Sequence, residues 1–336
     1  MADEKAVKEL SMAKGASGTK ICLMCQNLVK TQTALPPGSR LVDFACCDWT
    51  RICQHDHASI MQVWNYLRDV TATVTTQQAA KDISQAAGFN YSEYGLLSGP
   101  MAGVSNIPHS IYWDWMHTVV ASGGVAQYEL NQLLRRISTT IPLVHLDAFA
   151  KLVNHPARLR PPKMRFEKRV RNSSGAHINA FASETLHIMD VVKLFCDAMG
   201  QQLEHLRDEL KCFGLLFRIV QLLRQGRIVG ERLRLLRLLV LKHHTMFVEL
   251  YPACVKPKLH YLFHIPECIA LFGIVMSCFC PERKHRKGKH IGHFAFRQYC
   301  DTITRRVLRS ELDAHCKPET VSVVAAGPIR RETVDE

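Results

Sequence analysis

Several features that mark common protein classes are missing from this sequence. No run of ~18 apolar residues occurs, and the polar start MADEKAVKEL does not have the pattern of a signal peptide. There is also no Walker loop, no Gly-x-Ser-x-Gly elbow and no internal repeat. These absences argue against a membrane-spanning helix, a secretion signal, a P-loop nucleotidase, a hydrolase with a serine elbow and a repeat architecture.

Acidic residues are few beside basic ones. The chain has 30 Asp and Glu against 43 Lys and Arg, which leaves a net charge of +13 and a sequence pI near 9.2. Such a balance favours a polyanionic partner, with nucleic acid as the first candidate and an anionic membrane surface as the second. The 13 cysteines, an odd number spread over a long chain, indicate thiols or metal ligands rather than a disulfide framework.

Apolar residues recur at helical spacing along most of the chain, and 336 residues with 47% apolar content can bury a substantial core in one or two domains. Helices are predicted over residues 3–13, 60–87 with an interruption before 77, 125–137, 143–153, 185–203, 206–225, 231–250 and 294–312. Residues 89–107 read as a loop-rich connection, and residues 317–336 as a flexible tail. The predicted fold class is mainly α.

A Cys-x-x-Cys pair, Cys22 and Cys25, is the first candidate metal motif. Such a knuckle presents two thiolates to one zinc ion, but it supplies only half of a tetrahedral site. A redox pair or two buried thiols remain alternatives. If the pair binds metal, its partners must come from elsewhere in the chain.

The most economical supplier is a histidine pair, His260 and His264, one helical turn apart. Residues at this spacing lie on one face of a helix, close enough to share an ion. Pro257 is well placed to begin that helix, and Pro266 is expected to begin a second one that ends at Gly273. The two histidines are therefore expected in the last turn before a break.

A second group of cysteines and histidines follows a Pro-Pro-Gly turn. Its spacing matches no metal motif, so we favour buried cysteines beside surface histidines and keep a separate zinc site as the alternative. The residues are Cys46, Cys47, Cys53, His55, Asp56 and His57.

Asp114 and His117 lie among aromatic residues that are expected to be buried, in the stretch IYWDWMH. At this spacing both side chains share one face at the start of a helix. Two interpretations remain open: a functional acid and base, or an N-capping aspartate with a core histidine.

Basic residues are concentrated in two stretches, residues 158–171 and 283–289, and the single carboxylate Glu282 stands directly before the second. Both stretches suit a phosphate backbone, although solvated loops are the commoner occurrence of such charge. Further arginines are spread over residues 206–250, where a solvated helix face is favoured over a DNA-binding groove. They are Arg218, Arg224, Arg227, Arg232, Arg234 and Arg237.

Taken in order, these motifs resemble those of the DDE transposases of the CACTA/Mirage/Chapaev group, and also the related catalytic core of the V(D)J recombinase. Both belong to the RNase H-like class. The resemblance runs from about residue 3 to residue 289 and depends on the order of four elements more than on any single one. The matching elements are Asp3 followed by Gly15-Ala-Ser-Gly18 and Cys22-Leu-Met-Cys25, then Asp114-Trp-Met-His117, then His260-Tyr-Leu-Phe-His264-Ile-Pro-Glu267, then Pro281-Glu282-Arg-Lys-His285.

The resemblance implies two kinds of metal site. Asp3 would be the second catalytic aspartate and Glu282 the catalytic glutamate, each binding Mg²⁺ or Mn²⁺, with Asp114 and His117 in a supporting or ligating role. Two such ions activate a water or a 3′-hydroxyl and stabilise the leaving oxygen in DNA cleavage and strand transfer. One structural zinc would join the start of the chain to its end, bound by Cys22, Cys25, His260 and His264.

The sequence departs from the family pattern in one respect. The first catalytic aspartate of the family lies well upstream of the residue that Asp3 matches, so we expect an N-terminally truncated, degenerate transposase fragment with DNA-binding ability and no cleavage activity of its own. Non-catalytic alternatives are a zinc-stapled protein that binds nucleic acid and one that binds only other proteins.

The predicted organisation has four regions. Residues 1–35 would be a remnant of the RNase H-like core with the zinc knuckle, and 36–255 a helical insertion domain. Residues 256–315 would carry the histidine pair and the catalytic glutamate, and 316–336 a flexible tail. The expected partner is DNA in the nucleus, with no membrane partner and with a homodimer left open.

Overall fold

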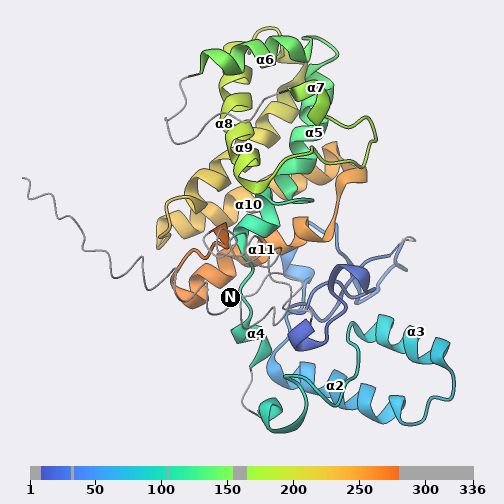
Figure 1. Ribbon diagram of the computed structural model, residues 1–336. Coiled ribbons are helices and arrows are strands. Elements are labelled where there is room, and N and C mark those ends of the chain that lie inside the picture. The colour runs from blue at the N-terminus through green and yellow to red at the C-terminus, as the bar shows by residue number, and fades with distance from the viewer. Residues whose placement is uncertain (1–8, 32–33, 104–105, 154–164, 280–336) are drawn as a thin grey trace, which may run out of the picture. The chain divides into compact units, whose positions relative to one another are not determined.

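The structure is a computed structural model that describes residues 9–31, 34–103, 106–153 and 165–279. The chain divides into two compact units, Met1–Cys278 and Phe279–Glu336, and nearly all described residues belong to the first. This unit is mainly helical (Figure 1), as the sequence predicted. No helix of the described part is long and apolar enough to cross a membrane.

The α-helices of the described residues are α2 (His57–Thr71), α3 (Gln77–Ala87), α4 (Ile107–Ser110), α5 (Val125–Ile137), α6 (Leu143–Leu152), α7 (Phe166–Arg169), α8 (Ala182–Ala198), α9 (Arg207–Leu223), α10 (Glu231–Leu250) and α11 (Pro257–Phe272). Shorter helical turns are η1 (Gly15–Ser17), η2 (Trp49–Arg51), η3 (Gly99–Gly103), the π-helical η4 (Met116–Val120), η5 (Glu204–Leu206) and η6 (Pro252–Cys254). Within the described residues, strands occur only as β1 (Leu28–Val29) and β2 (Val42–Asp43), which pair in parallel.

Helices α5, α8, α9 and α10 pack together into a helical body, with α9 and α10 side by side (Figure 1). Their facing sides are apolar, and Leu130, Phe213 and Val240 are almost completely buried there. Burial of this kind stabilises helices more than intrinsic propensity does. The apolar spacing predicted from sequence does not bury every apolar residue of these helices, since Leu194 of α8 is 49% exposed.

Several helix boundaries agree with those predicted from sequence. Helix α3 ends where Gly88 adopts a left-handed conformation with φ of 83°, and Thr76 caps its start by accepting a hydrogen bond from the Ala79 N–H. Glycine is favoured after a helix because it adopts this conformation without a Cβ clash. Helix α10 covers the predicted range without any difference.

The predicted break at Pro266 is wrong. Helix α11 continues from Pro257 through Pro266 and ends at Gly273, which has φ of 71°. A proline inside a helix removes one backbone hydrogen bond and usually kinks or ends it. Here the surrounding turn is packed into the interior, since Ile265 and Cys268 are both 1% exposed, and this burial holds the helical path.

Several predicted features lie outside the described residues. They are Asp3, Glu282, the basic stretch 283–289, the first half (158–164) of the basic stretch 158–171, the predicted helix 294–312 and the predicted tail. Of the predicted N-terminal helix 3–13, residues 9–13 are described: residues 9–11 are helical, but Met12 has φ of 56° and Ala13 pairs with Phe89 in an isolated bridge, so the helix ends two residues early.

Candidate metal centre

The Cys22–Cys25 knuckle is held in place by backbone pairing with a later segment of the chain. Cys25 and Gln54 form an isolated antiparallel bridge, in which the Gln26 N–H donates to the Cys53 carbonyl at 2.8 Å and the His55 N–H donates to the Met24 carbonyl at 2.9 Å. The Met24 N–H lies 3.4 Å from the Cys22 sulfur. These hydrogen bonds therefore fix the loop between the two cysteines without a bound ion.

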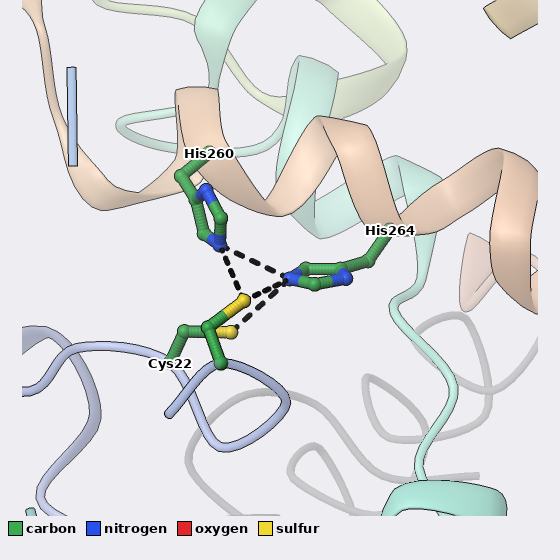
Figure 2. A group of neighbouring side chains, drawn as sticks. Cys22, His260 and His264 are labelled. Carbon is green, nitrogen blue, oxygen red and sulfur yellow. Dashed lines mark hydrogen bonds between the residues drawn. The ribbon is translucent and has the colours of Figure 1, made fainter. Parts of the chain in front are cut away.

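Helix α11 brings the histidine pair to this knuckle from more than two hundred residues away (Figure 2). The Tyr261 hydroxyl donates to the Ile21 carbonyl at 2.7 Å, which joins the helix to the knuckle between the two histidines. His260 and His264 are fully buried, and Cys22 and Cys25 are 5% and 0% exposed. The structure thus brings together all four residues that the sequence predicted as zinc ligands.

The four side chains meet through one atom each. His264 Nε2 lies 3.2 Å from the Cys22 sulfur and 3.5 Å from the Cys25 sulfur, and His260 Nε2 lies 3.4 Å from the Cys25 sulfur. The two Nε2 atoms are 3.0 Å apart. In tetrahedral zinc sites the bond lengths to sulfur and nitrogen imply S···N distances of about 3.6 Å and N···N distances of about 3.4 Å. The cluster is a few tenths of an ångström tighter and could bind such an ion after a small expansion.

Two of the four ligands, Cys22 and His260, have pKa shifts that favour their metal-binding forms, whereas Cys25 must lose a proton when an ion binds. Burial alone would raise the pKa of Cys22, but hydrogen bonding from Cys25 and the charge of His264 outweigh it and lower that pKa well below its ordinary value. Burial and the neighbouring Cys22 raise the pKa of Cys25. Burial lowers the pKa of His260 and favours the neutral ring. A thiolate and a neutral imidazole are the forms that bind metal.

Aromatic rings enclose the cluster, and sequence reasoning did not assign them to it. The Trp49 ring stacks on Phe263 at 5.1 Å and meets the His264 ring edge-on at 5.4 Å. The Trp113 ring stacks on Tyr261 at 4.0 Å and donates its indole N–H to the Met24 sulfur at 3.0 Å. An apolar shell of this kind limits the access of water to a metal site.

Asp114 and His117 are close together, as predicted, at the start of η4. One carboxylate oxygen of Asp114 accepts the His117 backbone N–H at 2.9 Å and lies 2.6 Å from its Nδ1. The other accepts the backbone N–H groups of Met116 at 3.3 Å and Cys278 at 2.8 Å. These bonds are those of a buried capping residue, and a catalytic role for the pair stays a prediction.

For the second cysteine and histidine group, the sequence favoured buried cysteines beside surface histidines, and this prediction of burial is wrong. Cys46 and Cys47 are partly exposed and Cys53 is exposed, whereas His55 is only 8% exposed. His55 turns inward because its Nδ1 pairs with the Ser59 hydroxyl at 2.8 Å, at the capped start of α2. Among the described residues this group does not form a metal cluster.

The arginines singled out within residues 206–250 are exposed, as a solvated face requires, and a DNA-binding groove stays the alternative. Arg224 pairs with Asp190 at 3.0 Å, and Arg237 pairs with Glu267 at 3.0 Å. Exposed pairs of this kind contribute roughly 0–1 kcal/mol each.

Comparisons with known proteins give no relative. No protein-family model matches the sequence, no curated protein matches it significantly, and no solved structure matches the fold significantly.

Proposed function

We propose that this chain is a DNA-binding protein of the DDE-transposase type whose two ends are joined by one structural zinc ion. The observation that carries the proposal is the convergence of Cys22, Cys25, His260 and His264 in one buried cluster. The resemblance to the transposases implies the same four residues as the ligands of one zinc ion. With all four positions taken by protein atoms, the ion has no open position for a substrate, which is typical of a structural site.

Zinc at this cluster would hold the knuckle against α11. Structural zinc contributes about 10–16 kcal/mol of apparent binding free energy in small peptides, so it can stabilise a fold that its local sequence alone does not. The ligands Cys22 and His264 are 242 residues apart in sequence. Closing a loop of this length restricts the unfolded chain by about 2 kcal/mol more than closing the ~25-residue loop of a local zinc finger.

DNA as the partner is supported by the net charge of +13. Each phosphate that a Lys or Arg neutralises releases counterions and steepens the salt dependence of binding. A nuclear location follows from the same proposal.

The catalytic part of the proposal concerns Mg²⁺ or Mn²⁺ bound by Asp3 and Glu282, with Asp114 and His117 in support. It is supported by the order of the motifs. It is also supported by the residue types, because Mg²⁺ and Mn²⁺ prefer the oxygen ligands that carboxylates supply. A non-catalytic DNA-binding protein with the same zinc site is the second candidate, and the charge balance alone favours it.

The first test is zinc content, measured by elemental mass spectrometry on the purified full chain and on Cys22→Ser and His264→Ala. Both variants should lose the same single ion, since each removes one ligand of a shared site. The partly exposed Cys46→Ser serves as the control and should keep it. Retention of all zinc in both ligand variants would refute the site.

The second test separates the functional candidates. Binding to duplex DNA should weaken steeply with salt, and Mg²⁺-dependent nicking abolished by Glu282→Gln would identify a transposase-type enzyme. Binding without nicking would select the non-catalytic candidate. A protein that keeps its zinc and binds no DNA would disprove the proposed partner.

A further inference from the structure

A second buried cluster lies inside the helical body, away from the knuckle in sequence. It consists of Glu129 on α5, Cys212 on α9 and His243 on α10, and each of the three is fully buried. One ligand atom from each lies within 4.8 Å of those of the other two. The closest contact joins Glu129 Oε2 to His243 Nε2 at 2.7 Å.

Polar atoms in this cluster lack partners. Glu129 Oε1, His243 Nδ1 and the hydroxyl of Tyr251 are buried without a hydrogen bond among the described residues. Buried polar atoms are almost always paired, and an unpaired carboxylate oxygen costs free energy unless an ion or a water satisfies it. Glu129 contacts both Cys212 and His243, and its unpaired Oε1 indicates that a partner from outside the chain fits beside these three groups.

The charges of neighbouring residues do not supply that partner. Arg136, two turns along α5 from Glu129, forms its ion pair with Glu209. Its guanidinium also lies 5.4 Å over the ring of Tyr251. The carboxylate of Glu129 therefore has His243 as its only described ion-pair partner.

We propose that Glu129, Cys212 and His243 bind a transition-metal ion of the zinc type. A carboxylate, a thiolate and an imidazole together suit Zn²⁺ or Co²⁺, whereas Mg²⁺ and Ca²⁺ avoid sulfur. Three protein ligands leave one position of a tetrahedral ion for a water or another small ligand. The ion would join α5, α9 and α10 at the centre of the helical body.

The test counts metal ions in the full chain. The wild type should carry about two zinc ions per chain, and Glu129→Gln should carry about one, because an amide keeps the shape and the hydrogen bond to His243 but is a poor zinc ligand. Glu209→Gln is the matched control, since it neutralises another buried carboxylate of the same body, and it should keep both ions.

A second measurement detects the bound metal by its absorption spectrum, so it does not depend on counting ions in a variant whose helical body has been changed. In Cys22→Ser/Cys25→Ser loaded with Co²⁺, the remaining cobalt should show thiolate-to-metal charge-transfer absorption from Cys212. The absorption should disappear when Cys212→Ser is added. It should persist when Cys196→Ser is added instead, because Cys196 is a buried thiol outside the cluster.

The outcomes for the two sites are distinct. One zinc per wild-type chain that depends on Cys22 alone would overturn the second site and leave the first in place. If Glu129→Gln retains both ions, the second ion is bound elsewhere and the proposal is likewise overturned. Loss of one ion in Glu129→Gln but not in Glu209→Gln would establish the cluster as a metal site.

Discussion

Single side chains decide how well the knuckle cluster is sealed from water. Trp49 is half-buried and contacts the rings of Phe263 and His264. Trp113 stacks on Tyr261, and its ring also lies 6.2 Å from that of His264. Neither tryptophan offers a metal ligand, so their contribution is to exclude solvent and to fix the ring orientations.

Trp49→Ala should therefore speed zinc loss without removing a ligand. We expect faster transfer of zinc to a chelator and a free energy of unfolding lower by roughly 2 kcal/mol, since a large half-buried ring is deleted. Trp49→Phe keeps an aromatic contact and should lie close to the wild type. An unchanged chelation rate in Trp49→Ala would show that this ring does not shield the site.

His55 should make stability sensitive to mild acid. Burial, and to a lesser degree the charge of Lys20, lowers the pKa of His55 to about 4, while Cys22 and Asp56 act in the opposite direction. The unfolded chain, with a histidine pKa near ~6.5, binds the proton more readily, so stability falls as pH drops from about 6.5 towards about 4.

His55→Asn should flatten this part of the pH profile, by roughly 1–3 kcal/mol across the window. The measurement is denaturant unfolding of both proteins at several pH values, with the difference between them removing the contribution of the other acid-sensitive groups. Parallel profiles for the two proteins would contradict a buried neutral His55.

At the scale of elements, the sequence predicted helices well and their interruptions less well. Helix α10 has a long periodic pattern bounded by Gly230, and α3 ends at Gly88, so local chemistry determined both ranges. The break expected at Pro266 failed because the rule for proline describes local cost, whereas α11 is buried on several sides. Tertiary packing of this kind is not visible in a local pattern.

Two glycines that end helices should differ in their tolerance of a side chain. At Gly273, φ is 71° and an added Cβ would meet nothing within 4 Å, so Gly273→Ala should cost only the backbone strain of about 1 kcal/mol. At Gly88, φ is 83° and the added Cβ would lie 2.9 Å from Lys20 Cβ.

Gly88→Ala should therefore cost clearly more than Gly273→Ala in denaturant unfolding, roughly 2 kcal/mol or above. It should also weaken zinc retention, because Lys20 leads directly into the knuckle at Cys22. Equal costs for the two variants would mean that the segment around Lys20 shifts freely.

At the scale of the whole molecule, the cluster of Cys22, Cys25, His260 and His264 could be predicted because four recognisable metal ligands occur in two short motifs. The cluster of Glu129, Cys212 and His243 could not, because its members are single residues on three helices and Glu129 is 114 residues from His243. In sequence each reads as an ordinary polar residue in an amphipathic helix. Even the neighbours of His243 in sequence, Lys242, His244 and Thr245, are polar and give no sign that its side chain is buried.

Loss of the knuckle ion should loosen the molecule locally. In Cys22→Ser, amide hydrogen exchange should rise by about tenfold or more in residues 20–29 and in α11, while α9 and α10 keep their protection through their own packing. Mass spectrometry of peptides after exchange measures this directly. A uniform rise over the whole first unit would instead make the zinc site a requirement for the entire fold.

The 242-residue separation between Cys22 and His264 also has a consequence during synthesis. At about 5–20 residues per second, a ribosome needs roughly 10–50 s to make the second half of the site after the first. For that interval the knuckle thiols have no histidine partners, and they are open to oxidation or to capture by other metals. The nascent chain thus carries a reactive dithiol that only the completion of α11 can protect.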